Sequence, residues 1–90
     1  MKGHSDLPLT SEFIAFDIET TGLSPQNDRM TEIGAILFQG GEIKQNFQCF
    51  VNPHMPIPPD IKRLTGISDE DVKDAPDEDE AMRRFLEFVD

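Results

Sequence analysis

Two adjacent glycines, Gly40 and Gly41, separate two runs of residues that favour β-strands. The first run is Glu32–Gln39, and the second ends before the pair Asn52-Pro53. Glycine supplies the positive φ angles that a two-residue hairpin turn requires. The sequence therefore predicts an antiparallel hairpin with its turn at Gly40 and Gly41.

A further strand is predicted over Phe13–Glu19, and the segment 20–31 after it holds the glycine, proline and asparagine typical of turns. Side chains alternate between the two faces of a strand. One face of this strand carries Phe13, Ala15, Asp17 and Glu19, and the other carries Ile14, Phe16 and Ile18, which we expect to be buried. On the last strand, alternation groups Ile43, Gln45, Phe47, Cys49 and Val51 on one face.

Helices are predicted in the second half of the chain. Pro59 suits the first position of a short helix through Leu64, and Gly66 suits its C-terminal cap. Ser68–Lys73 has a capping pattern for a second short helix, which Asp77 and Glu80 repeat. We expect the apolar stripe that follows to face the core: Met82, Phe85, Leu86 and Val89. The predicted fold class is α/β, a three-stranded antiparallel meander followed by helices.

The chain has a net charge of −10 over 90 residues. Such acidity disfavours nonspecific binding to a polyanion, because that affinity comes largely from Lys and Arg. Residues 67–90 hold ten acidic and three basic residues, so most of the acidity belongs to the C-terminal part. We interpret Asp69–Glu80 as a solvated approach to the helices, with an acidic interaction surface as the alternative.

Cys49 is the single cysteine, which excludes an internal disulfide framework and fits a reducing cytoplasm. No apolar run approaches the ~20 residues of a membrane span, and the start of the chain lacks the apolar segment of a secretory signal. We therefore expect a cytoplasmic protein without a membrane partner. Residues 1–11 are expected to form a flexible lead.

The sharpest chemical feature is a pair of carboxylates, Asp17 and Glu19. The strand rise places their Cα atoms about 6.6 Å apart on one face, so both side chains reach one place. Mg²⁺ and Mn²⁺ prefer oxygen ligands, and a cation relieves the repulsion between neighbouring carboxylates. The pair therefore indicates a metal site, and an exposed polar strand end is the alternative.

Longer strings of residues surround this pair. F-D-I-E-T-T-G-L at Phe16–Leu23 and T-E-I-G-A-I at Thr31–Ile36 resemble the first motif of the DnaQ-like 3′-5′ exonucleases, the DEDD superfamily with a ribonuclease H-like fold. The resemblance continues through Phe50–Pro53, Ile57–Ser68 and Asp74–Pro76. The later strings are most similar to the exonuclease domain of PolC-type DNA polymerase III or of DinG-type helicases.

The resemblance implies a role for each matching residue. Asp17 and Glu19 match catalytic carboxylates that bind two Mg²⁺ or Mn²⁺ ions, with Asp17 as the bridging ligand. Glu32 matches an acid for which we favour a structural or supporting role. Four residues match the segment that cradles the terminal nucleotide, with Thr21 against the sugar and Leu23 as an apolar wedge against the base: Thr20, Thr21, Gly22 and Leu23.

Thr65, at a helix end, is a weaker match to a substrate-binding position, and helix capping explains the neighbouring Gly66 equally well. The resemblance also implies the substrate and partners. They are a nucleic-acid 3′ end, in the first place single-stranded DNA in proofreading or repair, and a polymerase or helicase machinery.

In the family, the second-motif Asp, a general-base His and a final Asp lie beyond the equivalent of Asp90. We therefore expect residues 12–90 to be the N-terminal portion of an exonuclease domain, a partial ribonuclease H-like fold that lacks the later parallel strands and is inactive alone. The alternative is a degenerate, non-catalytic acidic binding module. The next family strand would pair beside the strand of Asp17, so we expect an open edge there that favours self-association.

Overall fold

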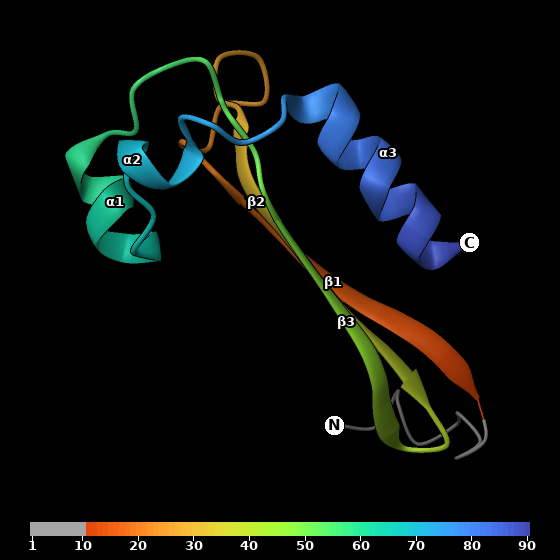
Figure 1. The fold of residues 1–90 in the computed structure, drawn as a ribbon. Helices are drawn as coiled ribbons and strands as arrows, with labels where there is room; N and C mark the ends of the chain where they lie inside the picture. The colour runs from red at the N-terminus through yellow and green to blue at the C-terminus, as the bar shows by residue number, and fades with distance from the viewer. Residues whose placement is uncertain (1–10) are drawn as a thin grey trace.

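The computed structural model describes residues 11–90 (Figure 1). Three strands form one antiparallel sheet in the order β1-β2-β3: β1 (Glu12–Thr20), β2 (Met30–Gln39) and β3 (Glu42–Phe50). Three helices follow: α1 (Pro59–Thr65), α2 (Asp69–Val72) and α3 (Glu78–Val89). This arrangement confirms the predicted meander followed by helices. The predicted lead, apart from Ser11, lies outside the described residues.

The hairpin between β2 and β3 turns at the two glycines, as predicted. Gly40 and Gly41 have φ angles of 62° and 80°, and Gln39 pairs with Glu42 across them. Both glycines therefore adopt the left-handed conformation that a primed two-residue turn requires.

The prediction for the faces of β3 is wrong at its first residues. Leu37 pairs with Gln45, but the next residue, Phe38, pairs with Ile43, so Lys44 is an extra residue in β3. A bulge of this kind interrupts the alternation of side chains along a strand. Ile43 consequently lies on the same face as Phe38 and not on that of Gln45.

The predicted caps of the first two helices are confirmed. Pro59 opens α1, and Gly66 ends it in the left-handed conformation, with a φ angle of 78°. Ser68 and Asp71 form a reciprocal capping box at the start of α2. Local capping chemistry therefore sets where both short helices begin or end.

The acidic stretch Asp69–Glu80 supplies the first turns of α2 and α3, as expected for an approach to the helices. Asp77 caps α3 by accepting a hydrogen bond from the Glu80 N–H. Hydrogen bonds of 2.7 to 2.9 Å from Arg83 and then Arg84 lower the pKa of the Glu80 carboxyl to about 2. The side chains of Arg83 and Arg84 remain exposed.

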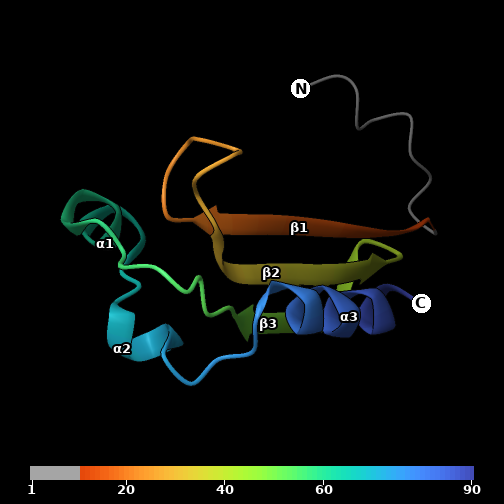
Figure 2. The same ribbon diagram turned by 90° about the horizontal axis from the view of Figure 1, so that it is seen from above.

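The main core lies between α3 and the sheet (Figure 2). Ile33 of β2, Cys49 of β3 and the following Val51 are buried against Ala81 of α3. Cys49 is a free, buried thiol. A second and smaller cluster packs around α1 and α2: Ile57, Ile67 and Val72.

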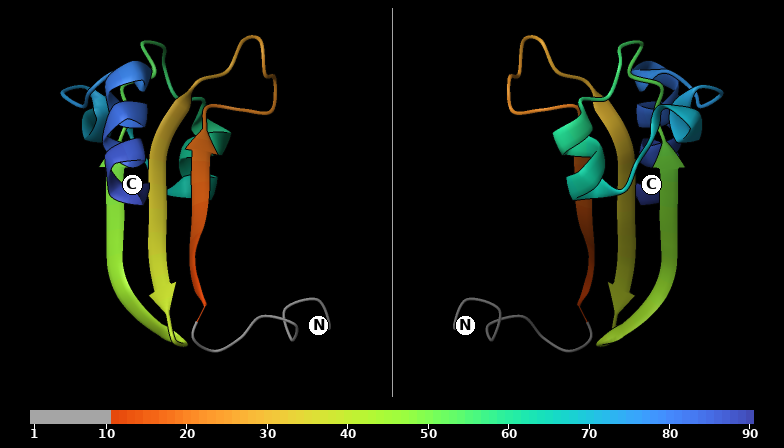
Figure 3. Two further views of the ribbon diagram at one scale, coloured as in Figure 1. Left: turned by 90° about the vertical axis from the view of Figure 1, so that its right-hand side faces the viewer. Right: turned by 90° about the vertical axis from the view of Figure 1, so that its left-hand side faces the viewer.

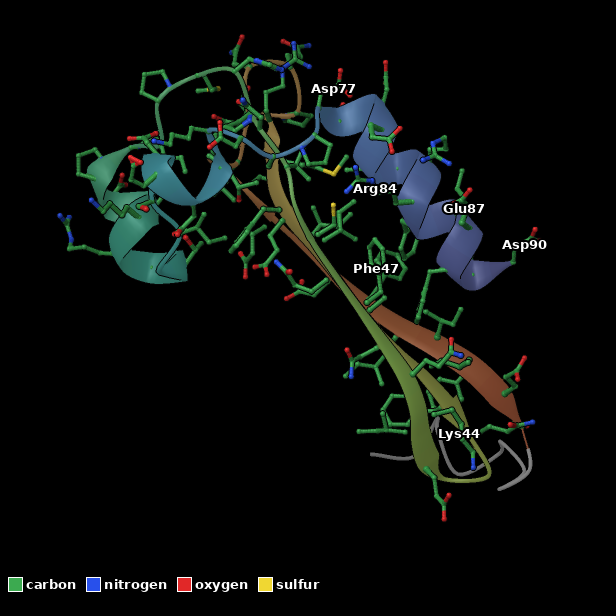
Figure 4. The ribbon with its side chains drawn as sticks, in the orientation of Figure 1. Lys44, Phe47, Asp77, Arg84, Glu87 and Asp90 are labelled. Carbon is green, nitrogen blue, oxygen red and sulfur yellow. The ribbon has the colours of Figure 1, made fainter. Side chains whose placement is uncertain are left out.

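The apolar stripe of α3 is rotated relative to the prediction. The rings of Phe85 and Phe88 lie 6.1 and 5.4 Å from the ring of Phe47, which points toward the helix (Figure 4). Leu86 is 57% exposed and Val89 is 38% exposed. The expectation that these two face the core is wrong, because the helix turns the side of Phe85 and Phe88 toward β3.

The expected burial of one face of β1 is also wrong. Phe16 is 60% exposed and Ile18 is 38% exposed. A helix is about 10 Å across, which covers two strands spaced about 4.8 Å apart. Since α3 lies over β2 and β3 (Figure 3), it reaches β1 through Phe85, whose ring lies 5.6 Å from that of Phe16.

The described chain is elongated. It measures 43 × 28 × 22 Å, with a radius of gyration of 15.3 Å, whereas a compact domain of this length has about 12 Å. The helices α1 and α2 gather at one end of the sheet, and the hairpin turn extends away at the other (Figures 1 and 2). Much of the sheet surface is therefore left without a covering layer.

Candidate functional site

Asp17 and Glu19 lie on one face of β1, near the end of the strand. In β2, Gly34 lies opposite Asp17 and Glu32 lies opposite Glu19. Asp17 is exposed and Glu19 is half-buried. A Cβ atom at Gly34 would meet no atom within 4 Å, so the space beside Asp17 is open. The two carboxylates therefore share an accessible face of the sheet.

A shallow hollow of about 460 Å³ lies beside Asp17. On this face the hollow is lined from all three strands by small or polar side chains and by one large apolar side chain, Ile36; the others are Ala15, Gly34, Asn46 and Gln48. A smaller hollow of about 250 Å³, between Arg29 and the start of α3, contains neither carboxylate. The chemistry of the carboxylate pair, and not the depth of either hollow, marks the candidate site.

Glu32 is bonded to the neighbouring strand. The Gln48 Nε2 atom donates a hydrogen bond of 2.8 Å to Glu32 Oε2, across β2 and β3. Within residues 11–90, no group of three or more His, Cys, Asp or Glu is placed to hold a metal ion. This part of the chain therefore offers two carboxylate ligands, and the supporting role of Glu32 stays a prediction.

The loop 21–29, between β1 and β2, is organised around Asp28. Its Oδ1 atom accepts a hydrogen bond of 2.9 Å from the Thr21 hydroxyl, and its Oδ2 atom accepts one of 2.8 Å from the Ser24 N–H. The Thr21 hydroxyl also accepts a hydrogen bond from the Arg29 N–H, at 3.0 Å. Thr21 is only 1% exposed, so its hydroxyl fixes the loop from within.

This role of Asp28 was not predicted, because aspartate is also common in ordinary turns. The available signal was an acid four residues after Ser24, in a segment whose buried N–H and hydroxyl groups need an acceptor. Gly22 gives the carboxylate its room, since a Cβ at that position would lie 2.5 Å from Asp28 Oδ2. Thr20 adds a hydrogen bond from its hydroxyl to the Gly22 carbonyl.

Leu23 lies in this anchored loop and is 99% exposed. It is held between Thr21 and Ser24, both of which are bonded to Asp28. An apolar side chain presented in this way is suited to contact a flat, weakly polar group such as a base. Its role as a wedge stays a prediction.

Thr65 ends α1 at the same end of the sheet as the loop (Figures 1 and 2). Its hydroxyl donates to the Ile61 carbonyl at 3.0 Å and accepts from the Ile67 N–H at 3.1 Å. The loop is linked to the segment before α1 by a contact of 3.5 Å between Thr21 Oγ1 and Met55 Sδ. The Thr65 hydroxyl thus stabilises the helix end, and its contact with substrate stays a prediction.

Solved structures share this arrangement of strands and helices. The nuclease domain of 3′hExo, a DEDDh family member bound to rAMP, has a TM-score of 0.78 at 21% identity over 87% of this chain and 43% of that one. Exonuclease X in complex with 5′ overhanging duplex DNA has a TM-score of 0.71 at 25% identity, over 80% of this chain and 42% of that one. The fold is therefore that of the ribonuclease H-like exonucleases, as predicted.

A family model matches most of the sequence. The RNase_T family model, described as exonuclease, matches residues 14–90, and the chain belongs to this family.

Curated relatives of this chain include DNA polymerases of one type. PolC-type DNA polymerase III from Caldanaerobacter subterraneus subsp. tengcongensis is 50% identical over 87 residues, which are 97% of this chain and 6% of that protein. The Bacillus subtilis polymerase of the same type is 44% identical over 77 residues, 86% of this chain and 5% of that protein. The resemblance to PolC-type enzymes is confirmed, and the chain spans about one-twentieth of their length.

Proposed function

We propose that this chain is the N-terminal part of a metal-dependent 3′-5′ exonuclease domain that hydrolyses phosphodiester bonds at DNA 3′ ends. The observation that carries the proposal is the pair of Asp17 and Glu19 on one accessible face of the strand that leads directly into the anchored loop of Leu23. Because the chain belongs to the exonuclease family, we assign the carboxylate pair and the loop to one site for the 3′ end.

Asp17 and Glu19 are the residues that would hold Mg²⁺ or Mn²⁺. Both offer carboxylate oxygens on one accessible face, which is the chemistry that these hard cations prefer. When bound, such ions stabilise the attacking and leaving oxygens of an in-line displacement at phosphorus. We expect weak binding, because residues 11–90 bring no third ligand to the pair.

The loop after β1 would position the 3′ end of the strand. Asp28 holds the loop in one shape, so Leu23 meets the terminal base without first being ordered. Thr20 and Gly22 are joined by a hydrogen bond and follow Glu19 directly in the chain, so we expect the sugar of the terminal nucleotide to approach here. Thr65 and α1 bound the same end of the sheet.

We expect the isolated chain to release nucleotides at a negligible rate. The reason is that two carboxylates alone do not complete a two-metal site, and the described residues supply no further ligand. The measurement is Mg²⁺-dependent release of nucleotide from 3′-labelled single-stranded DNA. Robust release that Asp17→Ala abolishes would contradict this expectation.

Binding of a reaction product tests the function without turnover. Isotope-labelled protein is titrated with thymidine 5′-monophosphate and Mg²⁺, and amide resonances are followed by NMR. We expect shifts confined to residues 17–23 and their β2 neighbours, lost in Asp17→Ala and kept in Asp79→Ala, which removes an exposed acid of α3. Shifts at the acidic first turns of α2 and α3 would instead favour an acidic binding module.

We propose a cytoplasmic setting in association with a DNA polymerase. The support for it is the similarity to PolC-type polymerases, together with the single free thiol. Within residues 11–90, no helix has the length and apolar character needed to cross a membrane.

A further inference from the structure

Two threonines are buried in the described chain, and their hydroxyls have different surroundings. Thr21, in the loop after β1, and Thr31, in β2, are each 1% exposed. Within residues 11–90, the Thr31 hydroxyl has no hydrogen-bond partner, whereas the Thr21 hydroxyl has several. Burying a hydroxyl costs free energy unless it is hydrogen-bonded. The network around Thr21 therefore offsets the cost of burying its hydroxyl.

The polar groups of Thr21 are turned into the molecule. Its N–H donates to the Arg29 carbonyl at 2.9 Å, and its hydroxyl oxygen accepts from the Arg29 N–H at 3.0 Å. Its hydroxyl proton is directed to Asp28 Oδ1 at 2.9 Å, with the Met55 Sδ atom at 3.5 Å. Because the side chain is also buried, a nucleotide could reach this hydroxyl only after the loop has opened.

Thr21 also joins two segments that are distant in sequence. The loop 21–29 carries the exposed Leu23. Met55 belongs to the segment between β3 and α1, which is fixed next to the helix by the buried Ile57. The loop and α1 lie at the same end of the sheet (Figures 1 and 2). Loss of the Thr21 hydroxyl should therefore loosen Leu23 relative to this end of the molecule.

We infer that Thr21 is a positioning residue: it sets the affinity for the terminal nucleotide by holding Leu23 in place, and it does not touch the sugar. This inference rests on the proposed function, and it replaces the direct sugar contact that the family resemblance implies. A protein whose binding-competent state is populated only part of the time loses affinity by that fraction. An anchored loop avoids this loss, because it needs no ordering when the nucleotide binds.

Thr21→Val tests the inference, since valine fills nearly the same space without a hydroxyl. We expect folded Thr21→Val to bind thymidine 5′-monophosphate with Mg²⁺ about tenfold more weakly than the wild type, the typical effect of losing one hydrogen bond to a charged group. NMR titration gives the affinity, and relaxation of the Leu23 amide should show larger motion in the variant. A merely structural role would lower the stability and leave the affinity of the folded chain unchanged.

Three further variants complete the comparison. Thr21→Ser keeps the hydroxyl and should recover most of the lost affinity. Thr31→Val removes a buried hydroxyl that has no partner in the described residues, so it should bind as the wild type does. Asp28→Asn keeps the shape of the acceptor without its charge, so it weakens the same hydrogen bond more gently and should lower the affinity even if Thr21→Val does not fold.

Two ligands separate positioning from contact. 2′,3′-Dideoxythymidine 5′-monophosphate lacks the 3′ hydroxyl, the polar group that a sugar contact would use. The inference predicts that Thr21→Val weakens the binding of both nucleotides by the same factor. A loss confined to the nucleotide with the 3′ hydroxyl would overturn the inference, and so would unchanged binding of both. Failure of the wild type to bind either nucleotide would instead overturn the proposed function, and the inference with it.

Discussion

Asp28 is not a predicted metal ligand, but its hydrogen bonds fix the loop that carries the predicted substrate-binding residues. Its Oδ1 atom accepts a hydrogen bond from the buried Thr21 hydroxyl, and its Oδ2 atom accepts one from the Ser24 N–H. Leu23 lies between these two residues in the sequence. The sequence resemblance pointed to the residues that face the substrate. The residue that holds them was missed, because a carboxylate in a turn-rich segment has many ordinary explanations.

Replacing Asp28 should destabilise the fold. In Asp28→Ala, the buried Thr21 hydroxyl and the Ser24 N–H lose their acceptor, which costs about 1–3 kcal/mol in the free energy of unfolding. Asn27→Ala, in the same loop but exposed, should cost less than about 0.5 kcal/mol. Denaturant unfolding measures both values, and equal losses would contradict the role of Asp28.

Two glycines, Gly22 in this loop and Gly34 in β2, form a matched pair of substitution sites. Gly22→Ala should cost about 1–3 kcal/mol, because its Cβ would lie 2.5 Å from the Asp28 carboxylate. Gly34→Ala, opposite Asp17, should change stability by about 1 kcal/mol or less, because nothing lies within 4 Å of the new atom. The cost of Gly22→Ala should fall in an Asp28→Ala background, and an unchanged cost there would contradict the clash.

At the scale of elements, local chemistry was predictable and packing was not. The glycine turn, the proline start of α1 and the caps at Gly66, Ser68 and Asp77 depend on near neighbours in sequence, and each was predicted. The buried side of α3 depends on which strands it crosses. The helical periodicity predicted an apolar stripe of the correct width. It did not show that Phe88, and not Leu86, packs against the sheet.

The rotation of α3 predicts a difference between two adjacent residues. Phe85→Ala removes ring contacts with both Phe16 and Phe47 and should cost about 2–3 kcal/mol, below the fully buried range because Phe85 is half-buried. Leu86→Ala should cost about 0.5 kcal/mol, since that side chain is exposed. Thermal or denaturant unfolding checks the order, and a reversed order would restore the stripe predicted from sequence.

Glu80 gives α3 a pH dependence with a defined sign. Its pKa is lowered from 4.5 in the unfolded chain to about 2 in the fold by hydrogen bonds from Arg83 and then Arg84. A lowered folded pKa contributes stability that is present above pH 4.5 and is lost as the pH falls toward 2.

The matched variants are Glu80→Gln and Glu42→Gln, which make the same charge change on α3 and on the distant hairpin. Glu80→Gln should flatten the fall in stability between pH 4.5 and 2, and by a small amount because the pair is exposed. Identical pH profiles for the two variants would contradict the assignment.

At the scale of the molecule, the fold class followed from the sequence but the extent of burial did not. Alternation along β1 correctly separated Asp17 and Glu19 from the apolar residues on its other face. It could not show that α3 covers two strands of three and leaves Phe16 exposed. The exposure of Phe16 and Ile18 follows from that shortage of cover.

The central claim is that Asp17 and Glu19 form the metal-binding half of an exonuclease site. Paramagnetic broadening of amide NMR signals by substoichiometric Mn²⁺ tests it most directly. The account predicts that signals around Asp17, Glu19 and the facing Gly34 broaden first, that Asp17→Ala with Glu19→Ala removes the effect, and that Glu78→Ala on α3 leaves it unchanged. Broadening that begins in residues 69–80, or that survives the double substitution, would contradict it.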